Sequence, residues 1–446
     1  MTVIYSARWV LPIISQLIED GAVAFESSNI IAVGPRTEIV SRFPDSRTED
    51  FGEAAILPGF VNTHSHLELT VMRGFLEREE NEFFAWLRKL TLARLAMSVE
   101  DLLVSATCGA IEAARAGVTC LGDASSAALQ PMKALREIGL RGIVYQESFG
   151  PDPGLAGENV AQLREQISEL RALEDGLVRV GVSPHAPYSV SGRQLELISR
   201  LAIDENLPLM MHAAESHAEK LFMLEGRGVF AEGLRARRIE WQAPGISTIQ
   251  YLKRHGVLET SPLLAHCINV DERDLELIKE HSASIAHCPK SNAKLGHGRA
   301  PFAEFIKREI KVGLGSDSVA SNNTCDMLEE ARFAMLLARL DMEVTAAQTL
   351  YGATLGGAQA LGKDDQIGAL AEGMQADITV VSLDGAHQQP VRDPTAALVF
   401  ASSGRDVLLT VVAGQEIYRY GRLKGVDEGQ LWEHLAQVRL KIDSIA

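Results

Sequence analysis

The stretch from residue 57 to residue 74 reads LPGFVNTHSHLELTVMRG, an apolar run that ends in two histidines. His64 and His66 stand two residues apart, so at the end of a strand their side chains project from the same face. Neutral imidazoles are good ligands for zinc and similar divalent ions. Two histidines can also lie together in a solvated loop, so a metal site requires further ligands elsewhere in the chain.

The same arrangement recurs along the chain, where short apolar runs alternate with longer amphipathic stretches. We predict strands over residues 56–63, 118–123, 142–146, 178–183, 207–212, 262–266, 283–287 and 311–315, with helices over residues 101–116, 192–205, 271–280 and 301–308. Eight strands separated by helices imply parallel pairing through right-handed crossovers. An open doubly wound sheet would alternate likewise. The count of eight, and the polar residues that end nearly every strand, favour an α/β fold with a closed (β/α)8 TIM-like barrel.

Both flanks of the chain have shorter strand patterns and Gly-rich turns. We predict strands over residues 21–25 and 30–34 near one end, and over 377–382, 396–401 and 407–412 near the other. Residues 1–57 and 365–425 are expected to pair into one small composite β-sandwich domain beside the barrel of residues 58–364. A closing helix is expected within residues 426–446, over residues 430–442.

Composition and charge exclude several classes of function. The 446 residues carry a net charge of −16, which argues against a nucleic-acid partner because such binding depends on clustered Lys and Arg. Charged residues break up the first apolar stretch, which predicts neither a signal peptide nor a membrane span. The five cysteines form no CxxC pair, and we expect them to be reduced and buried, as is usual in the cytoplasm.

Two further strand ends supply candidate metal ligands. His212 closes the apolar run LPLMMH, where a lone histidine would more often be a hydrogen-bonded core residue. Asp317 follows KVGLGS, where an aspartate is also a common helix N-cap. Together with His64 and His66, these two residues predict a site for one divalent ion. No lysine ends the fourth strand to bridge two metals, so a single ion is expected.

Catalytic candidates lie beside these ligands. Glu215 follows His212 by three residues, a spacing that could bring its carboxylate over the same pocket. His266 ends the run LLAH and could be a ligand or could hold a water molecule by a hydrogen bond. Asp317 suits a double role, because a carboxylate that binds the metal can also accept a proton from the attacking water.

The segments that carry this chemistry resemble the amidohydrolase superfamily. They are PGFVNTHSHLELTVMRG, SPHAPYS, HAAES, LLAHC, HCPKSNAKLGHGRAP and GLGSDSVASNN. They are most similar to the branch of methylthioadenosine/S-adenosylhomocysteine deaminases, aminodeoxyfutalosine deaminases and triazine chlorohydrolases. The resemblance covers nearly the whole chain and implies one metal, usually zinc and sometimes iron, at His64, His66, His212 and Asp317. It also implies that Glu215 protonates the substrate ring and that His266 contacts the nucleophilic water.

The resemblance further implies hydrolytic deamination of an aminated purine nucleoside, with release of ammonia. The expected partner is a small heterocyclic substrate, and a homo-oligomer is expected from the family. His185 matches a histidine that grips the substrate. Gln146 and Ser318 are further substrate-binding candidates, as are Glu68 and Trp86. Glu68 could instead be a solvated loop carboxylate, and Trp86 could serve in helix packing.

Two departures from that branch leave undecided which tail the nucleoside substrate carries. Gln146 and Glu147 stand where methylthioadenosine deaminases usually offer an arginine, although the plainer role for Glu147 is as a hydrogen-bond partner or helix cap. Residues 226–245 form a long Arg-rich segment between the fifth and sixth strands. It is either a solvated surface hairpin or subunit contact, or a lid whose arginines (Arg235, Arg237 or Arg238) meet a substrate carboxylate.

Three rival functions remain. A triazine chlorohydrolase would use the same site on a similar electron-poor ring, although the HxxE spacing to Glu215 favours deamination. A non-catalytic scaffold would have lost metal ligands, which this chain retains. A polynucleotide deaminase is disfavoured because its HxE…PCxxC signature is absent and the net charge of −16 has the wrong sign for a nucleic-acid substrate.

Overall fold

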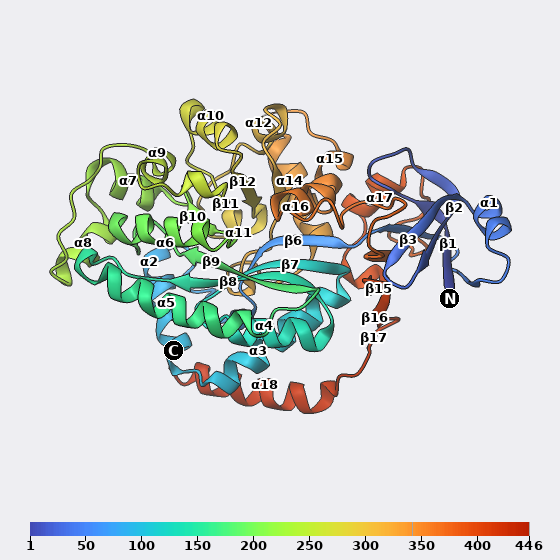
Figure 1. Ribbon diagram of the computed structural model, residues 1–446, viewed down its shortest axis with the longest axis horizontal. Coiled ribbons are helices and arrows are strands. Elements are labelled where there is room, and N and C mark those ends of the chain that lie inside the picture. Colours follow the sequence, from blue (N-terminus) through green and yellow to red (C-terminus); the bar gives the residue numbers. More distant parts are fainter. Residues whose placement is uncertain (341, 446) are drawn as a thin grey trace.

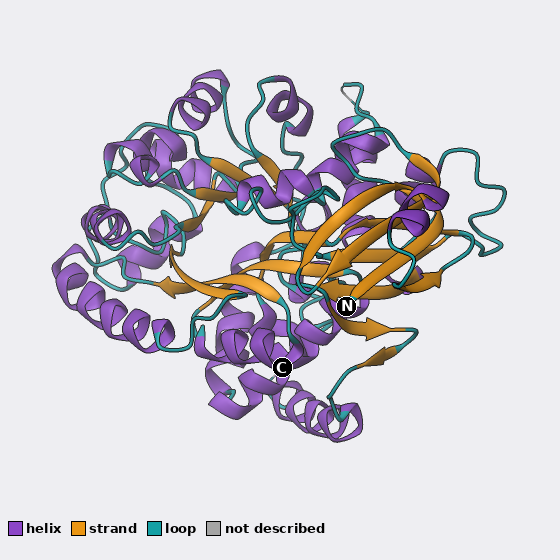
Figure 2. Ribbon diagram, turned by 45° about the vertical axis from the view of Figure 1, so that its right-hand side comes forward, coloured by secondary structure: helices purple, strands orange, loops and turns teal. Residues whose placement is uncertain are grey.

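Two groups of strands organise the molecule, and helices surround one of them (Figures 1 and 2). The computed structural model describes residues 1–340 and 342–445. Within these residues, no helix combines the length and the apolar character needed to cross a bilayer. All five cysteines are free and buried.

Eight parallel strands form the group that the helices surround. One sheet has the order β6 (Phe60–Ser65), β7 (Val118–Ser125), β8 (Arg141–Ser148) and β9 (Val178–Pro184), and the other has β10 (Met210–Ala213), β11 (Leu263–His266), β12 (Ser284–His287) and β13 (Val312–Leu314). Parallel bridges between Val182 and Leu209, and between Ser65 and Asp317, connect the two sheets. All eight strands therefore run in one direction and present their carboxyl ends on the same side.

Helices connect successive strands, as parallel pairing requires. The longer ones are α2 (Phe83–Ala96), α3 (Val99–Arg115), α4 (Leu129–Ile138), α5 (Ala156–Arg171), α6 (Gly192–Asp204), α7 (His217–Glu225), α8 (Val229–Ala236), α10 (Glu272–Glu280) and α14 (Met327–Ala338). Shorter ones are α9 (Thr248–Arg254), α11 (Pro289–Lys294) and α12 (Phe302–Lys307). The helices α13 (Val319–Asn322), α14, α15 (Ala346–Gly352) and α16 (Leu355–Ala360) follow β13, and α1 (Arg36–Arg42) belongs to the other strand group. The predicted helices correspond to α3, α6, α10 and α12.

Apolar side chains pack between the two parallel sheets. Val61, Ile143, Tyr145, Met210 and Ala265 belong to one buried cluster that draws on both parallel sheets. Because strand side chains alternate between faces, these positions mark the inward face of each strand. The interior is therefore packed, and a ligand site is left at the carboxyl ends of the strands.

The two flanks pair into one sheet. Its strands are β1 (Thr2–Val10), β2 (Ile18–Glu26), β3 (Asn29–Pro35), β4 (Arg47–Asp50), β5 (Ala54–Pro58), β14 (Ile378–Ser382), β15 (Val407–Val412), β16 (Gln415–Arg419) and β17 (Arg422–Leu423). The antiparallel pair β5–β14 joins the two ends of the chain. Hydrogen bonds link all nine strands in one sheet, and apolar clusters cover both of its faces.

The predicted strand over residues 56–63 is two strands. The chain leaves the nine-stranded sheet after β5 and enters β6 at Phe60, and the backbone amide of Gly59 donates to the carbonyl of Asp377 at the crossing (2.9 Å). A side chain at position 59 would lie 2.1 Å from Thr119, so only glycine allows this close approach.

The prediction of a strand over residues 396–401 is wrong, because this segment is part of helix α17 (Pro394–Phe400). The side chain of Asp393 accepts hydrogen bonds from the amides of Thr395 and Ala396, and Pro394 occupies the first turn. An aspartate N-cap followed by proline strongly favours the start of a helix. This capping signal outweighs the apolar run that follows it, which by itself is compatible with a strand.

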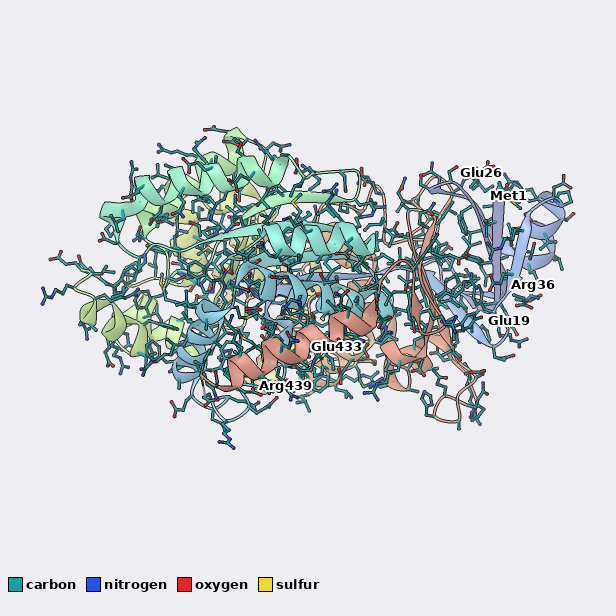
Figure 3. All side chains as sticks on the ribbon, turned by 90° about the horizontal axis from the view of Figure 1, so that it is seen from below. Met1, Glu19, Glu26, Arg36, Glu433 and Arg439 are labelled. Atoms are coloured by element: carbon teal, nitrogen blue, oxygen red, sulfur yellow. The ribbon has the colours of Figure 1, made fainter. Side chains whose placement is uncertain are left out.

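Helix α18 (Glu428–Asp443), which contains the predicted closing helix, runs along α3 on the underside of the molecule (Figures 1 and 3). Lys441 pairs with Asp101 at 2.6 Å, and Arg115 pairs with Glu428 at 2.6 Å. The labelled Glu433 and Arg439 mark the course of α18 in Figure 3. These pairs hold the end of the chain against the eight-stranded part.

A buried ion pair fastens the two strand groups together. Arg141, the first residue of β8, donates two hydrogen bonds to the carboxylate of Asp377, at 3.1 and 3.0 Å. Both side chains are almost fully buried, with exposed fractions of 2% and 1%. Asp377 also accepts the amide of Ala413, so one carboxylate links β8, β14 and β15.

Candidate metal centre and active site

The four predicted metal ligands converge at the carboxyl ends of the parallel strands. His64 lies in β6 and His66 directly follows it, His212 lies in β10, and Asp317 comes three residues after β13. One ligand atom from each of the four lies within 4.8 Å of all the others. Residues separated by up to 253 positions in the sequence thus form one cluster because parallel strands end on one side.

The geometry of this cluster fits a divalent cation. Asp317 Oδ1 lies 3.4 Å from His64 Nε2 and 3.5 Å from His66 Nε2, and the Nε2 atoms of His66 and His212 are 3.3 Å apart. His64 Nε2 is buried and has no hydrogen-bond partner among the described residues. Three imidazole nitrogens and one carboxylate oxygen directed at one point are the donor set of hydrolytic zinc sites.

The protonation states also suit a metal. Burial lowers the pKa of His64 to about 4, lowers that of His66, and takes that of His212 well below its usual value. Burial by itself would raise the pKa of Asp317, but the imidazole of His64, 3.4 Å away, holds the pKa well below the ordinary range. Neutral imidazoles and an ionised carboxylate are the forms that bind a cation.

Neighbouring groups orient the ligand atoms. His212 Nδ1 donates to the carbonyl of His185 (3.0 Å), which leaves Nε2 as its only free lone pair. Asp317 Oδ2 accepts from the hydroxyls of Ser291 (2.6 Å) and Ser321 (2.7 Å), which leaves Oδ1 toward the histidines. His212 and Asp317 therefore each have one atom held by the protein and one directed into the site.

The two catalytic candidates face each other beside the cluster. Glu215 Oε1 lies 3.7 Å from His266 Nε2, and His266 Nδ1 is 2.9 Å from the Asn292 side-chain oxygen. That amide oxygen can only accept, so Nδ1 carries the proton, and Nε2 has no hydrogen-bond partner among the described residues. Burial raises the pKa of Glu215 to about 7, so this carboxyl can hold a proton near neutral pH.

His297 is a neighbour of Glu215 that the sequence interpretation missed. Its Nε2 lies 3.7 Å from Glu215 Oε1, and its ring contacts Phe83 edge-on at 4.4 Å. Burial lowers its pKa to about 4, so the ring is neutral. The histidine lies in the loop after α11 rather than at a strand end, so the strand-end pattern gave no sign of it.

Left-handed backbone accompanies these residues. Ala214, His266 and Asp317 have φ values of 53°, 74° and 57°, which are uncommon for residues other than glycine. Such strain persists only where surrounding contacts over-determine it. At Ala214 the contact is a carboxylate: Glu219 accepts the amides of Ala214 (2.8 Å) and Glu215 (3.0 Å).

A cavity of about 370 Å³ reaches two of the four candidate metal ligands. His66 and Asp317 line it together with Glu215 and with aromatic and aliphatic side chains. Its described lining is His66, Glu68, Leu69, Phe83, Trp86, Leu87, Leu90, Thr91, Arg94, Leu95, Ser126, Glu147, Phe149, Tyr188, Glu215, Leu295, Asp317 and Ser318. A flat heterocycle can therefore reach the candidate metal ligands between apolar surfaces.

Three of the predicted substrate-binding residues line this cavity. Glu68 is buried and accepts hydrogen bonds from the amides of Ser126 and Ala127, so it is not a solvated loop carboxylate. Trp86 is also buried, on α2, and Ser318 caps α13.

The other two predicted substrate-binding residues are not part of the lining. His185 lies behind Phe149, with ring centroids 4.6 Å apart. Gln146 points away, and its amide donates to the carbonyls of Ser126 and Glu147. Glu147 lines the cavity instead.

The arginines of the segment 226–245 do not reach the cavity. Arg235, Arg237 and Arg238 are exposed, and the first two donate to backbone carbonyls of their own segment. The segment touches the site through Phe230 of α8, which stacks on Tyr188 with centroids 3.9 Å apart.

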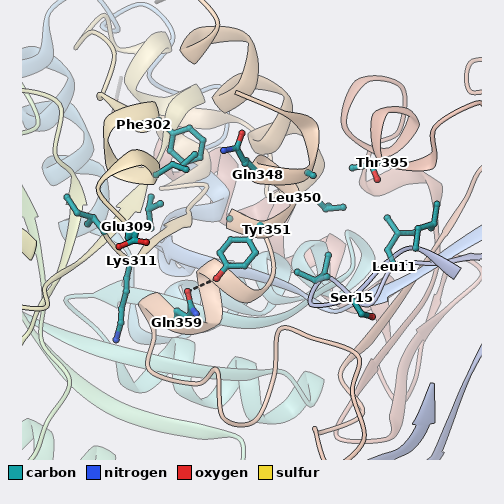
Figure 4. A pocket seen from close by; sticks show the side chains of 17 residues that line it. Leu11, Ser15, Phe302, Glu309, Lys311, Gln348, Leu350, Tyr351, Gln359 and Thr395 are labelled. Carbon is teal, nitrogen blue, oxygen red and sulfur yellow. Dashed lines mark hydrogen bonds between the residues drawn. The ribbon is translucent and has the colours of Figure 1, made fainter. Parts of the chain in front are cut away.

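Another cavity, at about 730 Å³, is larger than this one and lies elsewhere (Figure 4). It opens at the amino end of β13, between the β1–β2 connection and α15, where Tyr351 bonds to Gln359. None of the four metal-ligand candidates lines it. We therefore place the candidate active site in the smaller cavity, which holds the titratable cluster.

Comparison with known proteins agrees with this geometry. The sequence profile of the amidohydrolase family matches residues 55–417. A 5-methylthioadenosine/S-adenosylhomocysteine deaminase of Syntrophobacter fumaroxidans is 33% identical over 427 residues, 94% of this chain and 93% of that protein. The profile match spans the eight parallel strands and all four ligand positions.

Two solved structures superimpose on nearly the whole chain. An adenosine deaminase from Xanthomonas campestris with bound zinc has a TM-score of 0.87 at 28% identity and covers 99% of this chain and 98% of its own. Atrazine chlorohydrolase from Arthrobacter aurescens, complexed with zinc, has a TM-score of 0.85 at 22% identity and covers 98% and 100%. The second likeness is one of fold alone.

Proposed function

The chain belongs to the amidohydrolase family, and we propose that it is a metal-dependent hydrolase that deaminates an aminated purine nucleoside. The proposed substrate is an adenosine derivative such as methylthioadenosine, S-adenosylhomocysteine or aminodeoxyfutalosine, and the products are ammonia and the corresponding inosine derivative. The observation that carries the proposal is Glu215, a buried carboxyl with a pKa raised to about 7 that lies 3.7 Å from His266 beside the ligand cluster.

The proposed architecture places this site at the mouth of a barrel. We propose that the eight parallel strands close into a (β/α)8 barrel over residues 58–364. The bridges Val182–Leu209 and Ser65–Asp317 at the two sheet edges support this closure. Residues 1–57 and 365–425 would form the composite β domain, and residues 426–446 would hold the final helix.

His64, His66, His212 and Asp317 would hold one divalent ion, with zinc expected and ferrous iron as the alternative. Such an ion supplies Lewis acidity, by which water loses a proton near neutral pH. Asp317 would accept the proton that the attacking water gives up and pass it to the departing amine. His266 Nε2, which has no partner among the described residues, would orient that water by a hydrogen bond.

Glu215 would supply the proton that the purine ring needs. Attack at the carbon bearing the exocyclic amine pushes electrons onto the adjacent ring nitrogen, and protonation there prevents charge from building up. A carboxyl with a pKa near 7 is matched to this task at neutral pH. Glu68, Trp86 and Ser318 line the cavity and would contact the bound substrate. His185 and Gln146 would act from behind its wall.

A triazine-type chlorohydrolase, or another heterocycle amidohydrolase, is the second candidate. The fold shared with atrazine chlorohydrolase supports it only at the level of architecture. In this proposal the carboxyl of Glu215 protonates a ring nitrogen, and its HxxE spacing from His212 favours deamination. A non-catalytic scaffold is disfavoured because all four ligands and Glu215 are present and converge.

We further propose that the enzyme works in the cytoplasm as a homo-oligomer, without nucleic-acid or membrane partners. The five free, buried cysteines and the net charge of −16 support the compartment and the absence of a polyanionic partner. Size-exclusion chromatography with light scattering would measure the oligomeric state.

Ammonia release from the purified protein tests the function. The panel contains adenosine, methylthioadenosine, S-adenosylhomocysteine, aminodeoxyfutalosine, guanine, cytosine and a chlorotriazine, with metal analysis of the same sample. We expect turnover of an adenosine derivative and about one metal per chain. Glu215→Gln should keep the metal and lose most activity, while Glu225→Gln, an exposed change on α7, should keep both. Chloride release without ammonia release would reject deamination.

A further inference from the structure

Glu147 occupies the inward face of β8 at the mouth of the cavity. Ile143 and Tyr145 of the same strand belong to the apolar interior, and strand alternation places Glu147 on their face. The residue is 8% exposed and lines the cavity together with Glu215 and Asp317. Its Oε1 atom is buried and has no hydrogen-bond partner among the described residues.

A second metal ion does not explain this carboxyl. Glu147, His185 and His212 do offer ligand atoms within 4.8 Å of one another. However, His212 Nδ1 donates to the His185 carbonyl, so its only lone pair is on Nε2, which already faces His66 at 3.3 Å. One lone pair cannot serve two ions, and without His212 the second group has only two ligands.

No neighbouring cation explains it either. Arg94 is the only arginine or lysine of the described cavity lining, and its Nε donates to Glu68 at 3.2 Å. A buried carboxyl oxygen that lacks a partner is unfavourable in the protein alone. Burial and then the carboxylate of Glu68 raise the pKa of Glu147 to about 8. With or without its proton, a carboxyl can accept a hydrogen bond from a hydroxyl group.

We infer that Glu147 is a specificity-determining residue whose Oε1 accepts a hydrogen bond from a sugar hydroxyl of the substrate. The inference rests on the proposed function, because the ring and its exocyclic amine would then be engaged by Glu215 and the ligand cluster. In an adenosine derivative with an apolar tail, the two ribose hydroxyls are the remaining strong donors. Glu147 and Glu215 line the same cavity, so one ligand can meet both.

The test combines three proteins with three substrates. Wild type, Glu147→Leu and Glu147→Gln are assayed for ammonia release from methylthioadenosine and from its 2′-deoxy and 3′-deoxy counterparts. In wild type, loss of the hydroxyl that Glu147 receives should lower kcat/KM by about 10–100-fold. In Glu147→Leu that penalty should disappear, because the partner is gone, and Glu147→Gln, which keeps an acceptor oxygen, should restore part of it.

Product binding gives a readout that does not depend on turnover. Calorimetric titration of methylthioinosine and its deoxy counterparts should show the same loss of affinity in wild type and no loss in Glu147→Leu. The midpoint of thermal unfolding of Glu147→Leu should equal or exceed that of wild type, because an unpartnered buried carboxyl is removed. Glu137→Gln, an exposed change on α4, is the matched control.

Three results would overturn the inference. If removal of a ribose hydroxyl lowered kcat/KM equally in wild type and in Glu147→Leu, Glu147 would not be the acceptor of that hydroxyl's hydrogen bond. Two metals per chain in wild type and one in Glu147→Leu would make Glu147 a metal ligand. Absence of ammonia release from every adenosine derivative by wild type would reject the proposed function itself, and with it this assignment.

Discussion

The carboxylate of Glu219 holds the backbone that carries Glu215: its Oε2 accepts the amide of Glu215 at 3.0 Å, and its Oε1 accepts the amide of Ala214 at 2.8 Å. Ala214 has a left-handed φ of 53°, and Thr248 donates its hydroxyl to the same carboxylate at 2.5 Å. The turn that aims the proposed proton donor is therefore fixed by a side chain one helical turn further along the chain.

Glu219→Gln should disturb that turn. An amide offers one acceptor oxygen and places an N–H₂ group against the second backbone amide, so one of the two hydrogen bonds is lost. We expect kcat/KM to fall by about 10–100-fold, as for other groups that orient active-site residues, with metal content unchanged. Steady-state kinetics of Glu219→Gln beside Glu225→Gln would measure this. Unaltered kinetics in both would show that the turn does not need Glu219.

Loss of one metal ligand should remove both metal and activity. His66→Ala should lower metal affinity by more than about 100-fold, since even residues that only orient ligands contribute 10–100-fold. A chelator should inactivate wild type, and added zinc should restore it. Elemental analysis of His66→Ala beside His217→Ala, an exposed histidine on α7, would check this. Full metal content in His66→Ala would remove that residue from the ligand set.

The pH dependence of the reaction should report Glu215. A proton donor must carry its proton, and burial raises the pKa of this carboxyl to about 7. The protonated fraction is therefore high below pH 7 and falls as the pH rises through that value. We expect kcat/KM to decline about tenfold per pH unit well above pH 7. The residual activity of Glu215→Gln should lack this alkaline decline, and an unchanged profile would assign the decline to another group.

Breaking the ion pair between Arg141 and Asp377 should destabilise the fold. Asp377→Asn leaves a buried guanidinium without its charge partner, which costs about 3–5 kcal/mol. Urea unfolding of the variant should show that loss. The double variant Arg141→Met with Asp377→Leu should recover much of it, because neither charge is then buried. An equal loss in the double variant would mean that packing, rather than charge, dominates at this contact.

Much of the fold could be predicted from strand ends. His212 and His266 close apolar runs, and in the structure these runs are the parallel strands β10 and β11. Such runs are readable because a strand buried on both faces is apolar along its whole length. The composite sheet was also predictable in outline, although residues 396–401 are helical because Asp393 and Pro394 form a cap that outweighs the apolar run.

The candidate site was harder to predict where it depends on side-chain direction. Gln146 and Glu147 are neighbours at the end of β8, and only the inward face occupied by Tyr145 distinguishes them. His297 lies in a loop whose course depends on contacts such as that with Phe83. The alternation of side chains between the two faces of β8 could have been read from the sequence, and it would have placed Glu147 rather than Gln146 on the inward face. The position of the loop that carries His297 could not.

The pairing of β5 with β14 has a consequence for biosynthesis. Pro58 and Ile378 are register partners, so the ribosome must add about 320 residues after β5 before its antiparallel neighbour exists. At about 5–20 residues per second this delay lasts about 15–60 s. During that interval the emerging β1–β5 segment presents an open strand edge, which is a site for association with other chains. The β1–β5 segment therefore cannot complete its sheet until β14 has been synthesised. Nascent chains stalled before residue 378 should be those most dependent on chaperones.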